Sequence, residues 1–168
     1  AFLELGVPRF LELNAESPAG MGYASALGPL LLRDAAASGW GQLAFTDPVP
    51  QVVGALRSLA REWLVSTDAR ARGVEFAPRA RVAIVDFAGV PTAPEFDLLA
   101  EAFRRAGHAT AVVPPQDLRF DGDRLRTVEG PVDLLYRRFL VDDLRRNPEA
   151  CAPILAAVRA QRVCMVNS

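Results

Sequence analysis

The sequence predicts an α/β protein whose C-terminal part is a Rossmann-like domain with a mainly parallel sheet. The chain has 168 residues, 51% of them hydrophobic and 23% charged, which is the composition of a soluble globular protein. Nearly continuous apolar runs at 81–87 and 132–136 are typical of strands buried on both faces. Between them, apolar residues at 96–106 recur at helical intervals. This alternation indicates parallel strands joined by right-handed crossovers.

Two helices are expected before the sheet. The segment 25–37 is rich in alanine and leucine, and Gly39-Trp40-Gly41 would end it. Thr46-Asp47-Pro48 is a turn that begins the second helix. Its apolar stripe, interpreted as core packing, comprises Val52, Leu56, Leu59 and Trp63. The charged stretch 66–79 contains a glycine and a proline and is expected to be a linker or an exposed loop.

The later elements are expected in the order strand, helix, strand, hairpin, strand, helix and strand. The first helix of this series has Phe96, Leu99, Phe103 and Ala106 on one face and ends at Gly107. The other strands are expected at 109–113, 132–136 and 162–166, and a hairpin at 118–127 turns at Asp121-Gly122-Asp123. The last helix begins at Asn147-Pro148 and has Ile154, Leu155 and Val158 on its inner face.

Polar residues follow two of the predicted parallel strands. In such sheets ligands bind beyond the carboxyl ends of the strands, where Asp86, Arg137 and Arg138 would lie. An arginine there can bind a carboxylate or phosphate through two parallel hydrogen bonds. Alternatively, the two arginines form surface ion pairs with Asp142 or Asp143. Asp86 is either a functional acid or a hydrogen-bonded turn residue.

Charge, cysteine content and hydropathy exclude several classes of protein. The formal net charge is −1 with both signs interspersed, so no nucleic-acid surface is expected. Cys151 and Cys164 lack metal-ligand spacing and are expected to pack as small apolar residues in a reducing compartment, the cytoplasm. No apolar run is long enough for a membrane helix. The single histidine, His108, is interpreted as structural, and a hydrolase triad has no support.

A short motif near the N-terminus contains the candidate metal ligands. If 10–14 is a strand, Glu12 and Asn14 lie on the same face, because side chains two residues apart point the same way. A carboxylate and a side-chain carbonyl suit magnesium when nucleotide phosphates supply the other ligands. Alternatively, the pair is a solvated strand edge that leads into a turn at Ser17-Pro18.

Two segments resemble one enzyme family. The run FLELNAESPAG at 10–20 is similar to a segment of the glutathionylspermidine synthetase family, the circularly permuted ATP-grasp ligases. The run PVDLLYRRF at 131–139 resembles a strand of the Rossmann-like, pre-ATP-grasp-type domain that accompanies the ATP-grasp core. The resemblance implies that Glu12 and Asn14 bind magnesium and that Glu16 and Ser17 form a substrate-side loop, although the family has Asp-Thr at these two positions.

The same resemblance implies a domain organisation. It places a partial ATP-grasp core segment at 1–65, the linker at 66–79 and the Rossmann-like domain at 80–168. The family grips the nucleotide phosphates with two lysines, whereas all 19 basic residues of this chain are arginine. We therefore expect the lysine-bearing part to follow Ser168. Because the chain starts at Ala1 without a methionine and its first feature is already inside a motif, we also expect further sequence to precede it.

The implied activity is an ATP- and magnesium-dependent ligation of a carboxylate to an amine through an acyl phosphate. Arg137 and Arg138, with Ser17, would orient the carboxylate substrate, and the chain alone would be inactive as a ligase. The sequence does not identify the two substrates, a catalytic residue or the oligomeric state. The alternative is a non-catalytic α/β ligand-binding or interaction module in which Glu12 and Asn14 are only a strand edge.

Overall fold

A four-stranded parallel sheet forms the centre of the computed structural model, as the sequence predicts. The structure describes residues 2–4, 7–9, 16–41, 43–66 and 80–167. The strand order is β4-β3-β8-β9, and each neighbouring pair is parallel. The strands are β3 (Val82–Val85), β4 (Thr110–Val113), β8 (Leu134–Arg137) and β9 (Cys164–Val166).

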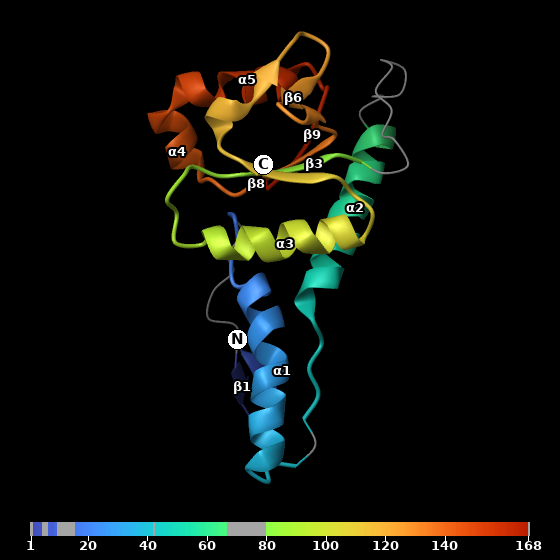
Figure 1. Ribbon diagram of the computed structural model, residues 1–168, viewed down its shortest axis with the longest axis vertical. Coiled ribbons are helices and arrows are strands. Elements are labelled where there is room, and N and C mark those ends of the chain that lie inside the picture. Colours follow the sequence, from blue (N-terminus) through green and yellow to red (C-terminus); the bar gives the residue numbers. More distant parts are fainter. Residues whose placement is uncertain (1, 5–6, 10–15, 42, 67–79, 168) are drawn as a thin grey trace.

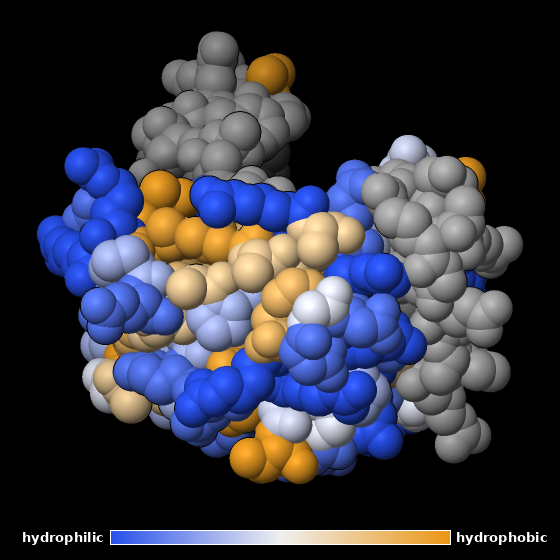
Figure 2. Space-filling view, turned by 90° about the horizontal axis from the view of Figure 1, so that it is seen from above, coloured by the Kyte–Doolittle hydropathy of each residue, from blue (hydrophilic) through white to orange (hydrophobic). Residues whose placement is uncertain are grey.

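Both faces of this sheet are covered (Figure 1). Alternate residues of β3 enter different apolar clusters: Val82 and Ile84 pack with α2 (Pro48–Ser66) and α3 (Ala93–Arg105), whereas Ala83 and Val85 pack with α5 (Pro148–Arg159). Figure 2 shows hydrophilic side chains around the molecule's upper side, where α5 lies, with an apolar band between them. The α5 side also has a small antiparallel sheet of β5 (Arg119–Phe120), β6 (Leu125–Thr127) and β7 (Gly130–Pro131).

The helix α1 (Met21–Ala37) extends away from the sheet (Figure 1). It begins four residues before the predicted start, and its buried positions are Gly22, Gly28 and Ala35. Its leucines at 27, 30 and 31 are exposed. Near the middle of α1, the ring of Phe45 lies so close to Gly28 that a β-carbon there would overlap it. The N-terminal strands β1 (Phe2–Glu4) and β2 (Val7–Arg9) pair antiparallel.

The start of α2 is confirmed, but one residue of its predicted stripe is wrong. Asp47 accepts a hydrogen bond from the Val49 amide at 3.0 Å and so caps the helix. Leu56 is buried, whereas Leu59 is 47% exposed. The buried face comprises Val49, Val53, Leu56, Ala60 and Leu64. Both the predicted stripe and the observed face of α2 have helical spacing. Packing against the sheet buries the face that contains the small Ala60 rather than Leu59.

The other predicted elements lie close to their expected positions, including the hairpin β5–β6. The helix α4 (Val141–Arg146), the 3₁₀ turn η1 (Pro115–Asp117) and β7 were not predicted, and each is short. His108 is buried and its ring lies 3.1 Å from the Ala80 carbonyl, in agreement with a structural role. Both cysteines are free and buried. Of the predicted linker, only Ser66 is described, and it ends α2.

Candidate functional site

The candidate site lies at the carboxyl edge of the parallel sheet, between β3 and β8. The chain leaves β3 through α3 to reach β4, on one side of β3, whereas β8 pairs with β3 on the other side. The gap between β3 and β8 is therefore the topological switch point, the place where open α/β sheets bind ligands. Asp86 follows β3 at this edge, Arg137 is the last residue of β8, and Arg138 follows it.

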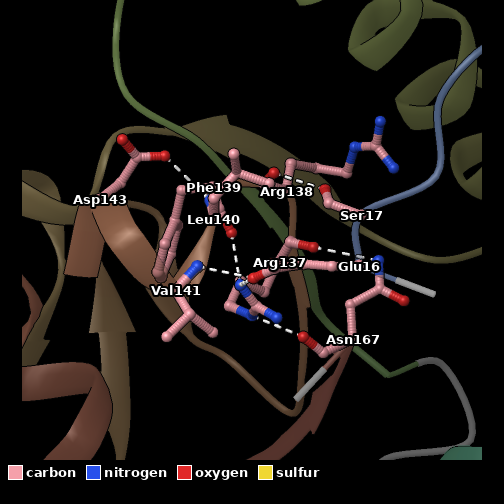
Figure 3. A network of polar contacts seen from close by, with 9 residues as sticks. All are labelled: Glu16, Ser17, Arg137, Arg138, Phe139, Leu140, Val141, Asp143 and Asn167. Carbon is pink, nitrogen blue, oxygen red and sulfur yellow. Dashed lines mark hydrogen bonds and ion pairs between the residues drawn. The ribbon is translucent and has the colours of Figure 1, made fainter. Parts of the chain in front are cut away.

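Arg137 holds the loop that follows the N-terminal motif. Its Nη1 lies 3.1 Å from Glu16 Oε1 and 2.6 Å from the Phe139 carbonyl, and its Nε donates to the Asn167 carbonyl at 2.5 Å (Figure 3). The Arg137 side chain is only 4% exposed. Glu16 Oε1 also accepts the Val141 amide at 2.6 Å. That amide and then the Arg137 guanidinium hold the pKa of Glu16 below its ordinary value.

Arg138 points to the opposite side of β8 from Arg137, as neighbouring strand residues do (Figure 3). Its Nη2 lies 3.6 Å from Glu95 Oε2, and the two side chains are 2% and 0% exposed. Its Nη1 donates to the Tyr136 hydroxyl at 3.1 Å and to the Pro18 carbonyl. The guanidinium also lies 5.5 Å from the centre of the Phe96 ring.

Glu95 connects Arg138 to the start of α1. Its Oε1 accepts the Gly22 amide at 2.8 Å, and a β-carbon at Gly22 would lie 2.8 Å from Glu95 Cγ. The Ser17 hydroxyl donates to the Arg138 carbonyl. Contacts on both sides of β8 thus fix residues 16–22 to the sheet. On one side Arg137 binds Glu16. On the other side Arg138 binds the Pro18 carbonyl, and its partner Glu95 binds the Gly22 amide.

The structure brings together all four residues that the resemblance assigns to the substrate side: Glu16, Ser17, Arg137 and Arg138. They contact one another. The alternative of surface ion pairs with the helix-α4 acids is wrong, because both arginines are buried. Asp142 instead pairs with Arg146 at 2.6 Å, and the Asp143 carboxylate accepts the Leu140 amide at 2.9 Å.

Asp86 has the contacts of a turn residue. Its Oδ1 accepts the amide of the next residue, Phe87, at 2.7 Å. Burial raises the pKa of this carboxyl, an effect that the Phe87 amide and the charge of Arg138 partly offset. The negative charge of Asp143 acts in the same direction as burial.

The predicted metal ligands Glu12 and Asn14 lie outside the described residues. Within the part of the chain that the structure describes, no group of three or more histidine, cysteine, aspartate or glutamate side chains is arranged to hold a metal ion. The donor set of Glu12 and Asn14 fits magnesium by its chemistry, a carboxylate and an amide oxygen to which a nucleotide would add phosphate oxygens.

Glu95 was not predicted as a site residue, although its position in the sequence indicates a buried charge. Glu95 lies four residues before Leu99 and so on the apolar face of α3, where an unpaired carboxylate is costly. A charge at such a position indicates a buried partner, which the structure identifies as Arg138.

Comparison with models of known protein families finds no match for this chain, and comparison with curated protein sequences finds none either. Among the described residues, no helix is both long and apolar enough to cross a membrane.

Proposed function

We propose that this chain is part of an ATP- and magnesium-dependent carboxylate-amine ligase of the circularly permuted ATP-grasp type. The supporting observation is the attachment of residues 16–18 to the carboxyl edge of the parallel sheet by Arg137 and Arg138. Residues 16–18 follow the candidate metal motif in the sequence, and the edge to which they are attached is where α/β sheets bind ligands.

In this proposal the N-terminal segment belongs to the ATP-grasp core and the sheet is its companion domain. Glu12 and Asn14 would hold magnesium with ATP, and the bound metal would offset the negative charge that develops as a phosphoryl group passes to the carboxylate substrate. Arg137 and Arg138 would hold the 16–18 loop against the sheet, so that Glu16 and Ser17 keep a fixed place on the substrate side. The partners would be a small carboxylate and a small amine.

The cytoplasm is the compartment that we propose. Cys151 and Cys164 are free and buried, and burial raises the pKa of the Cys164 thiol to about 12. Two unpaired thiols are typical of a reducing compartment.

The test uses the complete gene product that contains this chain. We expect magnesium-dependent ADP release when amino acids, short peptides or polyamines are supplied, and a loss of about a hundredfold in Glu12→Gln. Glu149→Gln, an exposed carboxylate at the start of α5, is the matched control and should retain full activity. A Glu12→Gln variant as active as the parent would refute the role of Glu12 as a metal ligand. ATP turnover by the 168-residue chain alone would refute the proposal that this chain contains only part of the active site.

The second candidate is a non-catalytic α/β ligand-binding or interaction module. The observation that favours it is the engagement of both arginines by the protein's own carboxylates, Glu16 for Arg137 and Glu95 for Arg138. Arginines neutralised in this way attract a substrate carboxylate less than free ones would. If the complete gene product releases no ADP with any amine and acid, and binds no magnesium-ATP in calorimetry, this second candidate replaces the first.

A further inference from the structure

A cavity of about 420 Å³ lies between α2 and α3, away from the carboxyl edge of the sheet. Val49, Pro50, Val53 and Gly54 of α2 form one wall, and the C-terminal half of α3 forms another. Ser25 of α1 adds a hydroxyl group. None of the lining residues belongs to the arginine site at β8. The volume lies within the range of about 300–1,000 Å³ that is typical of small-molecule sites.

The cavity exists because small residues occupy the crossing of the two helices. Nothing lies within 4 Å of the position that a β-carbon on Gly54 would take. Opposite, α3 contributes Ala102 and, just beyond its end, Ala106. Val49 and Val53 are 5% exposed and belong to the core, so they give the cavity a rigid apolar wall. An apolar ligand body would replace the missing side chains.

The charged groups of the lining favour an anion. Arg57 and Arg105 line the cavity, and Asp47 is the single acid among the lining residues. One oxygen of Asp47 already accepts the Val49 amide, at 3.0 Å. Arg105 Nε lies 3.9 Å from Glu101 Oε1, but the two side chains are 73% and 57% exposed. An ion pair this exposed to water is weak. Both guanidinium groups can therefore bind a ligand anion.

We propose that this cavity binds a small amphiphilic organic anion. Its apolar body would lie between α2 and α3 against Val49 and Val53, and its carboxylate or phosphate head group would bind Arg57 and Arg105. The inference does not depend on the proposed ligase function, because the two sites share no residue.

The test is a titration of the isotopically labelled 168-residue chain with octanoate, octyl phosphate and octylammonium, followed by amide NMR shifts. We expect the two anions to bind one to one with a dissociation constant of about 1 mM and to shift the amides of Gly54 and Ala102, whereas octylammonium binds at least tenfold more weakly. The tighter of the two anions identifies the preferred head group.

Two variants test the position. Gly54→Leu fills the cavity and should abolish binding, whereas Gly54→Ala adds one methyl group in open space and should keep it. Arg57→Gln with Arg105→Gln should weaken binding of the anions by about tenfold and strengthen binding of octylammonium, because the two positive charges that repel it are gone. Circular dichroism checks that each variant folds.

Three results would overturn the proposal. The first is anion binding that Gly54→Leu leaves unchanged, which would place the ligand elsewhere, for example on the exposed leucines of α1. The second is equal affinity for octylammonium, which would remove the role of the arginines. The third is a dimer in sedimentation that Gly54→Leu dissociates, with no probe bound below 10 mM, which would make a second copy of the chain the occupant of the cavity.

Discussion

Replacing Arg138 by methionine should strongly destabilise the protein, because it leaves a charge buried without a partner. Glu95 is 0% exposed, and its Oε2 has no hydrogen-bond partner among the described residues beyond the ion pair with Arg138 at 3.6 Å. Methionine fills a similar space but cannot neutralise this carboxylate. The variant also loses the hydrogen bonds of Arg138 to the Tyr136 hydroxyl and the Pro18 carbonyl.

We expect Arg138→Met to lower the free energy of unfolding by about 3–5 kcal/mol, the usual cost of removing one partner from a buried ion pair. The double variant Arg138→Met/Glu95→Gln should recover part of this loss, with a coupling energy of about 1–3 kcal/mol, because the remaining group is neutral. Glu95→Gln keeps an oxygen that can accept the Gly22 amide.

Urea unfolding followed by circular dichroism measures these differences. The control is Arg146→Met, which removes an ion pair of 2.6 Å whose side chains are 73% and 54% exposed, and which should cost only about 0–0.5 kcal/mol. A loss below about 1 kcal/mol in Arg138→Met would show that Arg138 does not balance a buried charge on Glu95. If Arg138→Met does not fold, Glu95→Gln alone tests the same pair, and a stability equal to that of the parent would be the refuting result.

Three further predictions follow from single contacts. Gly22→Ala should cost about 1–3 kcal/mol of stability, because its methyl group would lie 2.8 Å from Glu95 Cγ. Asp86→Asn should raise the melting temperature at pH 7 but not at pH 3. Burial raises the pKa of Asp86 in the folded state, so the ionised carboxylate destabilises the fold, and this destabilisation grows as pH rises through that pKa. Cys164, whose pKa is raised to about 12, should react with a thiol reagent at pH 8 only after unfolding, as mass spectrometry would show in a variant whose other cysteine is serine.

The glycine and aspartate predictions each have a matched control. Gly54→Ala meets no atom within 4 Å and should stabilise α2 by about 1 kcal/mol, so equal losses at both glycines would contradict the packing argument. Glu16→Gln should behave opposite to Asp86→Asn, because the pKa of Glu16 is lowered: it should destabilise at pH 7, and the effect should fade as pH drops through the folded pKa. An Asp86→Asn variant less stable than the parent at pH 7 would contradict the unfavourable burial of Asp86. Fast reaction of Cys164 with the thiol reagent in the folded protein would contradict the burial of that thiol.

Local sequence patterns were sufficient for most elements of the fold. The buried strand β3 is an almost continuous apolar run, and α3 repeats Phe96, Leu99 and Phe103 on one face, so each element has a signal within its own few residues. The prediction was wrong for Leu59, because two faces of α2 have helical spacing and only the neighbouring elements select between them.

Four residues of the candidate site were predicted, but the contacts between them were not. The sequence indicated Glu16, Ser17, Arg137 and Arg138 separately, on two segments. Their pairing joins residues 121 positions apart, and no local pattern encodes such a pair. The place of Glu95 on the apolar face of α3 indicated that it has a buried partner, but the identity of that partner, Arg138, could not be predicted because it is distant in sequence.

Periodicity and apolar runs act over short distances, so the amino-acid pattern was enough to predict the α/β class and the order of most strands and helices. Tertiary structure alone decided that Arg137 and Arg138 face opposite sides of β8, that Glu16 and Glu95 neutralise them, and that the loop after Asn14 is attached at the switch point. The physical reason is burial: a guanidinium group removed from water needs an anion, and only the folded chain brings the carboxylates to it.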